Sequence, residues 1–467
     1  MNNQNETSLQ YFQKVLKPGK NVFYFLLSLV ISLVLTYLLR APGFSDSQDY
    51  VMFLLFFSVG LWLTEAIPPF AVALFIMAFL VFSLGNPRFN SQPQHVSKYV
   101  QTFSSSIIWL MLGGFFLAES MTKTGLDADL FKFSIRLSGN KPKNILLGLM
   151  LTTMVASMIL SNTATTAMVI ASITPLLNYL GKKSFSKALL AGIPLAASVG
   201  GMGTIIGSPT NAIAVGALEN AGITVSFLRW MLIGVPLALL LTLAGWWLLS
   251  KKYITDNEPV VTDFLVETNE QNTGDLKRQR QIVLIVFIVT VLLWLTSSVH
   301  NLSVSAVAAI PIVFLTMTGI LKAADMRKLP WDTLMLVAGG LSLGLSLQET
   351  GMLEYFASAI TETGFTKIAM FFAFGFGTMI FSNVMSNTAT STILIPLGIY
   401  LMPHEAAEVA VIIGLAASTA LLLPVSTPPN AIAYSTGLME QKDFLRSGLM
   451  IGLLGPVLIV LFVLIFV

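Results

Sequence analysis

The sequence contains the same polar motif twice. Residues 157–165 read Ser-Met-Ile-Leu-Ser-Asn-Thr-Ala-Thr and residues 382–390 read Ser-Asn-Val-Met-Ser-Asn-Thr-Ala-Thr, so that Asn162 and Asn387 lie 225 positions apart. Both copies are embedded in apolar sequence, where an unpaired hydroxyl or amide costs several kcal/mol unless it faces a partner, a cavity or a ligand. The repeat therefore predicts two related halves that together build one polar site.

Composition indicates a membrane protein. Hydrophobic residues make up 55% of the 467 residues and charged residues 10%, and the mean hydropathy is +0.79, values atypical of soluble domains. Apolar stretches long enough to cross about 30 Å of hydrocarbon recur along the chain. A polar, Lys-bearing segment without a small-residue cleavage site precedes the first stretch, so we expect residues 22–39 to remain as a span.

Several classes of function are disfavoured by the residue types. The chain has no cysteine, and its three histidines, His95, His300 and His404, are scattered near expected span ends. No His-Glu-x-x-His helix, catalytic dyad or thiol nucleophile is present, so we do not expect an enzyme. The net charge of +3 is small and gives no reason to expect a nucleic-acid partner.

We expect an all-α polytopic membrane protein with about eleven transmembrane helices and two re-entrant hairpins. The hairpins are expected near 142–180 and 366–402, because irregular backbone at membrane depth is tolerated only where it lines a cavity or is covered by protein. Charge alone does not distinguish a hairpin from two full crossings. The spans are expected near residues 22–39, 51–63, 68–84, 105–121, 186–221 (broken), 227–249, 282–299, 304–321, 331–348, 405–437 (broken) and 446–467.

The positive charges predict the orientation. With the N-terminus inside, 21 of the 26 Lys and Arg residues lie on the inner face, as cytoplasmic loops require. The exceptions are Arg40, Arg88, Lys98, Arg229 and Lys367. We therefore expect an integral protein of a bacterial inner membrane, with a cytoplasmic N-terminus and the C-terminus outside.

The chain divides into two repeat units of five spans each, separated by the charged stretch 251–281, with the first span outside both. An odd number of spans inverts the second unit. Two further matches support the repeat: Gly113-Gly114 with Gly339-Gly340, and Pro209-Thr-Asn211 with Pro428-Pro-Asn430. Inverted repeats with broken helices are the architecture of secondary transporters.

The two motif tips have the chemistry of an anion cradle. Asn162, Thr163, Asn387 and Thr388 offer amide and hydroxyl donors where a helix begins, and its free N–H groups and positive dipole end point the same way. Two such tips would clamp the carboxylates of a short dicarboxylate without a Lys or Arg, which would be costly at that depth. The alternative is that these side chains only cap or join helices.

Oxygen atoms beside the tips suit a small hard cation. Ser157 and Ser161 lie one helical turn apart, as do Ser382 and Ser386, and the broken helices 203–209 and 424–429 would add unwound carbonyls. The motif segments contain no Asp, Glu or His to carry a proton. The carboxylates nearest to the apolar spans, Glu65, Glu119 and Glu349, lie close to expected span ends and are not expected to carry protons. Sodium is therefore the favoured coupling ion.

The sequence resembles the divalent anion/sodium symporter family, which includes sodium-coupled transporters of succinate, citrate and sulfate. The resemblance is carried by Ser161-Asn162-Thr163, by Ser386-Asn387-Thr388, and by residues 417–432 with their Pro-Val-Ser-Thr-Pro-Pro-Asn run. Leu421 and Ala433 stand where the family pattern has Phe and Val, respectively. These departures leave the polar positions unchanged.

The resemblance implies a homodimer that works as an elevator, in which a transport domain moves substrate and sodium across against a scaffold. Amphipathic segments near 127–137 and 353–362 would act as horizontal arms. The implied parts are a cytoplasmic segment 1–21, scaffold 22–140, transport domain 141–250, cytoplasmic linker 251–281, scaffold 282–365 and transport domain 366–467.

The resemblance also assigns site residues. Asn162, Thr163, Asn387 and Thr388 would contact substrate, with Pro429 nearby. One sodium would be held by Ser157, Ser161, Asn162 and the Gly207 carbonyl, and another by Ser382, Asn387 and carbonyls near Ser386 and Ser426.

Threonine in both motifs resembles the carboxylate-transporting branch of the family more than the sulfate branch, so the resemblance implies symport of succinate, fumarate or malate with two or more sodium ions. A sodium-independent dicarboxylate exchanger, citrate or sulfate as the substrate, and an anion channel remain the alternatives.

Overall fold

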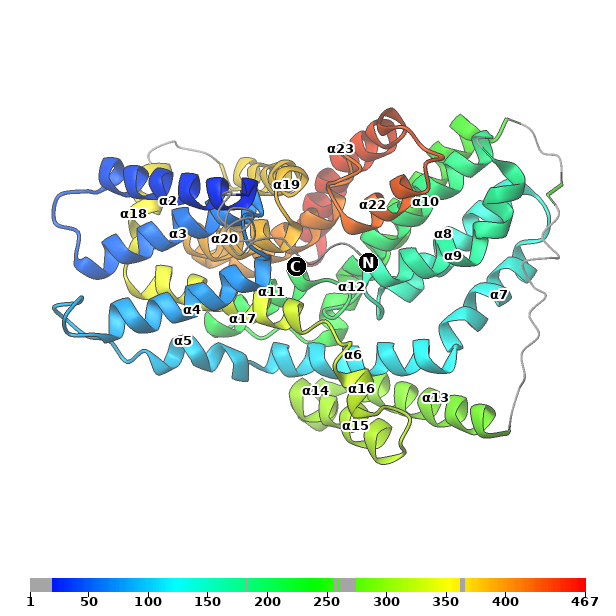
Figure 1. Ribbon diagram of the computed structural model, residues 1–467, viewed down its shortest axis with the longest axis horizontal. Coiled ribbons are helices and arrows are strands. Elements are labelled where there is room, and N and C mark those ends of the chain that lie inside the picture. The colour runs from blue at the N-terminus through cyan, green and yellow to red at the C-terminus, as the bar shows by residue number, and fades with distance from the viewer. Residues whose placement is uncertain (1–18, 182, 256–258, 261–273, 362–365) are drawn as a thin grey trace, which may run out of the picture.

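The computed structural model describes residues 19–181, 183–255, 259–260, 274–361 and 366–467. Its regular elements in these ranges are helices (Figure 1). The elements of the first half are α2 (Lys20–Leu39), α3 (Asp46–Thr64), α4 (Pro69–Gly85), α5 (Ser97–Gln101), η1 (Thr102–Ser104), α6 (Ser106–Thr124), α7 (Leu126–Ser138), α8 (Pro142–Ser157), α9 (Asn162–Leu180), α10 (Ser184–Gly200), η2 (Gly201–Gly203), α11 (Pro209–Asn220) and α12 (Phe227–Tyr253).

The second half repeats this order from α13 onward. Its elements are α13 (Gly274–Leu295), α14 (Ser297–His300), α15 (Val304–Met317), α16 (Ala323–Met326), α17 (Trp331–Glu349), α18 (Met352–Thr361), α19 (Lys367–Val384), α20 (Asn387–Leu401), η4 (Pro403–Glu405), α21 (Ala406–Ala416), η5 (Ala417–Thr419), α22 (Pro428–Ser435) and α23 (Gln441–Phe466). The pair α8–α9 thus corresponds to α19–α20, and α10–α11 to α21–α22.

The protein is an integral membrane protein, but its helices are less uniform than expected. Within the described ranges nine helices are long and apolar enough to cross a membrane, or up to ten with a bent pair counted as one span. Two expected spans are short, since α4 has 17 residues and α15 has 14, against the roughly 20 that a perpendicular span needs. A third expected span, the glycine- and serine-bearing α17, is not apolar enough to count among the nine.

The helix breaks lie close to where the sequence predicts them. The segments expected as hairpins, 142–180 and 366–402, are the helix pairs α8–α9 and α19–α20, and the helices of each pair pack against each other. Helix α20 and the segment Pro403–Thr419 meet at a bend of 116°. The expected broken spans are α10–α11 and α21–α22, interrupted around Pro209 and Pro428. The arm expected at 353–362 is α18, except that residue 362 lies outside the described residues.

Two matching helix crossings join the halves. Helix α6 packs against α15, as Figure 1 shows, and α17 packs against α4. Glycine allows both approaches: a Cβ at Gly113 would lie 2.7 Å from the Cβ of Ala308, and one at Gly339 would lie 2.5 Å from the Cβ of Ala73. Gly113 and Gly339 are 226 positions apart, so each half contributes the same crossing to the other.

A charged contact is also repeated, with its sign reversed. Lys123, at the end of α6, pairs with Asp325 in α16, whereas Glu349, at the end of α17, pairs with Lys98 in α5 and accepts a hydrogen bond of 3.0 Å from Tyr99. Lys123 and Glu349 are 226 positions apart. Equivalent helix ends therefore carry opposite charges.

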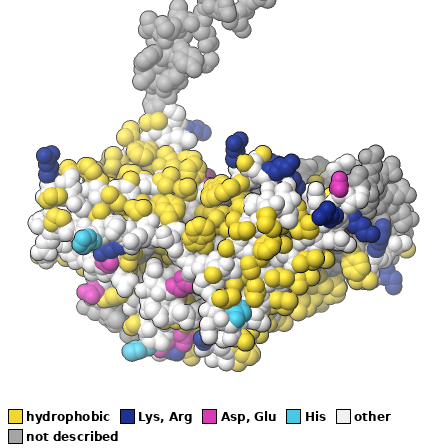
Figure 2. Space-filling model, turned by 90° about the horizontal axis from the view of Figure 1, so that it is seen from below, with side chains coloured by type: hydrophobic (Ala, Val, Ile, Leu, Met, Phe, Trp, Pro, Cys, Tyr) yellow, Lys and Arg dark blue, Asp and Glu magenta, His cyan; other side chains and the backbone are white. Residues whose placement is uncertain are grey.

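The outer surface is apolar. Figure 2 shows hydrophobic side chains over a broad area of one face, with most Lys and Arg side chains towards its borders. Large exposed side chains include Tyr37 and Leu38 on α2 and Ile285 on α13. Exposed apolar area of this extent indicates contact with lipid or with another protein.

Candidate functional site

Both motif tips are helix starts with the same cap. Helices α9 and α20 begin directly after a serine whose Oγ accepts a hydrogen bond from the backbone N–H of the third residue on: Ala164 N to Ser161 at 3.1 Å, and Ala389 N to Ser386 at 3.2 Å. Serine at an N-cap satisfies one of the free N–H groups and leaves the others directed beyond the helix end. The two serines assigned to sodium thus also act as caps.

Oxygen atoms from two elements converge beside the first tip. The Ser157 hydroxyl is buried and lies 2.6 Å from Asn162 Oδ1 and 2.8 Å from the Ala197 carbonyl oxygen in α10. A Cβ at Gly201 would lie 2.7 Å from the same Asn162 oxygen and 3.0 Å from the Gly207 carbonyl oxygen. The structure therefore brings Ser157, Asn162 and Gly207 together, as predicted from the sequence.

The matching atoms of the second tip are left without partners. Ser382 Oγ and Asn387 Oδ1 are buried and have no hydrogen-bond partner within the part of the chain that the structure describes. Buried oxygens without a protein partner are available to coordinate a cation or to accept a hydrogen bond. The Ser426 hydroxyl is engaged elsewhere, since it donates to Asn383 Oδ1 at 2.9 Å.

Two asparagines hold the unwound segments, a function that we did not assign from the sequence. Asn211 Nδ2 donates to the carbonyls of Gly201 and Thr204, both at 2.8 Å. Asn430 Nδ2 donates to the carbonyls of Leu421 at 3.3 Å and Leu423 at 3.0 Å. The signal was the Pro-x-Asn repeat itself, in which Asn211 and Asn430 match, and the neighbouring Pro429 is buried.

The two tips differ in exposure. Along α9, Thr163, Ala164 and Ala167 are exposed, whereas along α20 Ala389 and Thr392 are fully buried. Helix α22 is likewise open on one side, with Val425 before it 81% exposed. Helices α11 and α20 instead pack on α17, and Thr392 meets Gly340 there. In each pair of equivalent helices, one member is therefore covered, α20 or α11, and the other, α9 or α22, is accessible.

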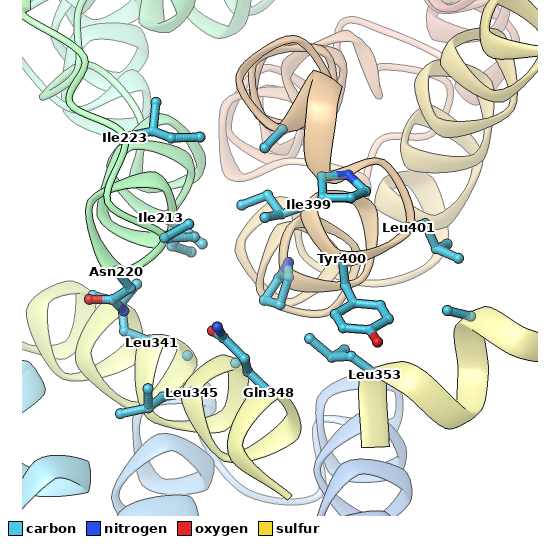
Figure 3. A pocket seen from close by; sticks show the side chains of 18 residues that line it. Ile213, Asn220, Ile223, Leu341, Leu345, Gln348, Leu353, Ile399, Tyr400 and Leu401 are labelled. Carbon is cyan, nitrogen blue, oxygen red and sulfur yellow. The ribbon is translucent and has the colours of Figure 1, made fainter. Parts of the chain in front are cut away.

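A cavity of about 520 Å³ lies on the covered side, between α11, α17, α18 and α20 (Figure 3). Its lining is mainly apolar, with Asn220, Gln348 and Tyr400 as polar exceptions. The residues that line it include none of the tip residues, so this cavity is not the candidate site. It lies between α17–α18 on one side and α11 and α20 on the other, a contact that we call the seam.

The site uses neutral oxygens. Among the described residues no group of three or more His, Asp or Glu is placed to hold a metal ion. Hydroxyl, amide and carbonyl oxygens are the ligands that hard cations prefer. The arrangement is therefore suited to a hard monovalent cation and an anion at helix N-termini.

Comparison with known proteins gives relatives along the whole chain. A sodium-dependent dicarboxylate transporter, SdcS, of Staphylococcus saprophyticus is 30% identical over 469 residues, covering 92% of this chain and 88% of the relative. SdcS of Staphylococcus aureus strain USA300 is 28% identical over 454 residues, covering 89% and 85%.

Two solved structures share the fold at low identity. MtrF of Neisseria gonorrhoeae, from a class of antimetabolite efflux pumps, matches with a TM-score of 0.57 and 12% identity over 85% of this chain and 94% of its own. The YdaH transporter of Alcanivorax borkumensis matches with a TM-score of 0.55 and 13% identity over 85% and 98%.

The family model described as the sodium:sulfate symporter transmembrane region matches residues 19–467. With the paired tips and broken helices in place over that range, the chain belongs to the sodium:sulfate symporter family of transporters, the divalent anion/sodium symporters that its Ser-Asn-Thr motifs resemble.

Proposed function

We propose that this protein is a secondary transporter that couples the uptake of a C4-dicarboxylate, such as succinate, fumarate or malate, to sodium. The observation that carries the proposal is the pair of capped tips, each with a cluster of buried oxygens beside it. The names of the SdcS relatives support sodium and dicarboxylate as the transported species.

The tips explain how a dianion is held without a basic residue. Asn162 and Thr163 at one tip and Asn387 and Thr388 at the other donate hydrogen bonds to the two carboxylates, with Pro429 nearby. Free N–H groups and the dipoles of α9 and α20 add positive potential. A C4-dicarboxylate has two carbon atoms between its two carboxylates, so it offers one carboxylate to each tip.

Sodium ions complete the charge balance. One ion is bound by Ser157, Ser161, Asn162 and the Gly207 carbonyl, and a second by Ser382, Asn387 and the carbonyls near Ser386 and Ser426. Each ion lies beside a substrate-binding amide, so binding of sodium and of the dianion is cooperative. Two or more ions per substrate are therefore expected.

Alternating access proceeds by an elevator movement of an inverted repeat. The scaffold consists of 22–140 and 282–365, with 22–39 outside the repeats and α7 and α18 as arms. The transport domain consists of 141–250 and 366–467. Helices α9 and α22 are exposed, whereas α11 and α20 are covered by α17. This arrangement corresponds to a state that is open towards the side of the membrane where α9 and α22 end.

That side is the cytoplasm. The inner loops, including residues 1–21 and 251–281, carry most of the Lys and Arg residues. The N-terminus is cytoplasmic, the C-terminus is outside, and the protein works in a bacterial inner membrane as a homodimer.

Uptake of radiolabelled succinate into proteoliposomes tests this proposal. An inward sodium gradient is compared with an equal potassium gradient and with succinate-preloaded vesicles without sodium. Accumulation driven by sodium alone is expected. Uptake only into preloaded vesicles would indicate an exchanger, equilibration without counterflow would indicate a channel, and competition of sodium-driven uptake by citrate or sulfate alone would change the substrate.

A further inference from the structure

The two broken helices contain matching four-residue turns, each closed by a side-chain hydroxyl, but the hydroxyl occupies a different position in each turn. In the first turn, Gly207 N donates to the hydroxyl of Thr204 at 3.0 Å. In the second, Leu423 N donates to the hydroxyl of Ser426 at 2.9 Å. Thr204 matches Leu423 and Gly207 matches Ser426, each 219 positions apart. The hydroxyl is thus at the start of one turn and at the end of the other.

The same hydroxyls tie the turns to the hairpin tips, again in two ways. Thr204 Oγ1 donates to the backbone carbonyl of Met158. In the second half, Ser426 Oγ and Leu422 N both donate to the side-chain oxygen of Asn383, each at 2.9 Å. Met158 and Asn383 are 225 positions apart and therefore equivalent. A main-chain acceptor in one half is replaced by a side-chain acceptor in the other.

Asn383 is well placed to hold this arrangement. Its side chain is 8% exposed, and its Nδ2 donates to the Met379 carbonyl at 2.9 Å, which fixes the direction of Oδ1. It directly follows Ser382, whose hydroxyl has no partner in the described structure. An amide that accepts two hydrogen bonds from the unwound turn sets the distance between that turn and the tip.

We infer that Asn383 and Thr204 are positioning residues for the two sodium sites. Each fixes an unwound turn against its hairpin tip: Thr204 belongs to the turn and bonds to the tip, whereas Asn383 belongs to the tip and bonds to the turn. This inference rests on the proposed function. Neither side chain needs to touch the ion: each holds in place the turn that presents the Gly207 or Ser426 carbonyl. Residues that orient ligands in this way typically contribute about 10–100-fold to metal affinity.

The test compares Asn383→Leu, which lacks the acceptor, with Asn383→Gln, which keeps both the amide acceptor and the amide donor. The sodium concentration for half-maximal succinate uptake is measured in proteoliposomes at saturating succinate. We expect Asn383→Leu to raise this concentration about tenfold, with the succinate KM at saturating sodium close to that of the unchanged protein, and Asn383→Gln to restore it. Thr204→Val and Thr204→Ser form the equivalent pair, and Thr316→Val, whose exposed hydroxyl bonds only within α15, is the control.

A second readout is the rise in Tm that sodium produces in the purified, succinate-free protein, which should shrink in Asn383→Leu. If the unchanged protein shows no sodium activation, the proposed function itself fails. If it is activated and Asn383→Leu has the same sodium dependence, the positioning role is overturned. A fall in uptake and in sodium-free Tm that Asn383→Gln does not rescue would leave only a structural role and would also overturn the positioning role.

Discussion

The two tips share their sequence but not their surroundings. At the first, the Ser157 hydroxyl has oxygen partners in Asn162 and Ala197, and the helix that follows is exposed. At the second, Ser382 Oγ and Asn387 Oδ1 are buried without partners, and the helix that follows lies against α17. A repeated sequence in two environments is what alternating access requires, because the opposite state exchanges the environments.

We expect the second tip to respond more strongly to sodium. A bound cation would give Ser382 Oγ and Asn387 Oδ1 a partner. The Ser157 hydroxyl of the first tip already has partners and would gain less. This contrast sets the order of the following predictions.

The largest effect is expected for Asn387→Ala compared with Asn162→Ala. Each change removes one amide that we propose to contact substrate and sodium, so uptake should fall about 10–100-fold, corresponding to about 1–3 kcal/mol. Because Asn387 Oδ1 has no partner in the described structure, Asn387→Ala should not lower the sodium-free Tm, but should abolish the sodium-induced gain. Thermal unfolding with and without sodium measures this, and an unchanged sodium gain would contradict the assignment.

Threonine substitutions at the tips should act on the substrate alone. Thr163→Ala and Thr388→Ala each remove one hydrogen bond to a carboxylate, so the succinate KM should rise about 5–100-fold. The sodium dependence at saturating succinate should stay the same. Uptake kinetics at fixed sodium provide the measurement. Unaltered KM values in both variants would exclude a site made of two tips.

Cysteine labelling sharpens the contrast in exposure, since the natural chain contains no cysteine. Ala167→Cys and Thr392→Cys occupy equivalent positions, 225 residues apart, with the first exposed and the second fully buried. In inside-out vesicles, a charged maleimide should modify position 167 several-fold faster than position 392. Equal labelling rates would mean that positions 167 and 392 are equally accessible and would contradict the difference in exposure between α9 and α20.

Glycine substitutions test the seam at α17. A Cβ at Gly340 would lie 2.6 Å from Thr392 Oγ1, whereas one at the equivalent Gly114 would lie 2.9 Å from the flexible end of Ile206. Gly340→Ala should therefore slow maximal uptake more than Gly114→Ala, with sodium activation unchanged in both. Initial rates at saturating sodium and succinate give the comparison. A larger effect of Gly114→Ala would contradict the proposed seam.

The smallest effect is expected at the reversed ion pairs. Hydrogen bonds from Lys123 and from the backbone N–H of Lys322 lower the pKa of Asp325 from its ordinary value of 3.8. A lowered pKa contributes stability above the unfolded-state value, and this stability is lost as the pH falls through the folded-state value. Asp325→Asn should reduce Tm by about 1–4 °C at pH 7.

The pH dependence gives the control for that change. The Tm difference between the unchanged protein and Asp325→Asn should shrink as the pH falls below the unfolded-state pKa of 3.8 and through the lower folded-state pKa, below which both carry a neutral side chain. Thr316→Val should show no such trend. A difference that stays constant over this pH range would indicate packing rather than charge.

Much of the architecture could be predicted from local sequence. The helix breaks were located because Ser-Asn caps, Gly and Pro mark helix ends regardless of context, as at Asn162 and Pro209. Span number was harder to predict. The glycine-bearing α17 packs mostly against protein, so it needs less apolar length than a span that faces lipid. Helices α4 and α15 are short although part of their surface is exposed.

The contacts between an unwound turn and its tip could not be predicted from matching residues. Asn383 stands opposite Met158 in the repeat, so comparing identical positions overlooks it. Its role depends on the distance from an unwound turn about 40 residues away, which tertiary packing sets. The difference in exposure between α9 and α20 likewise arises from the conformation adopted and not from composition.

Equilibrium binding of radiolabelled succinate to the purified protein, at high and at negligible sodium, tests the central claim most directly. The account predicts one succinate per chain, bound only with sodium, and weakened by Thr163→Ala as well as by Thr388→Ala. Two succinates per chain, or a site that responds to changes at one tip only, would contradict a single site built by both halves.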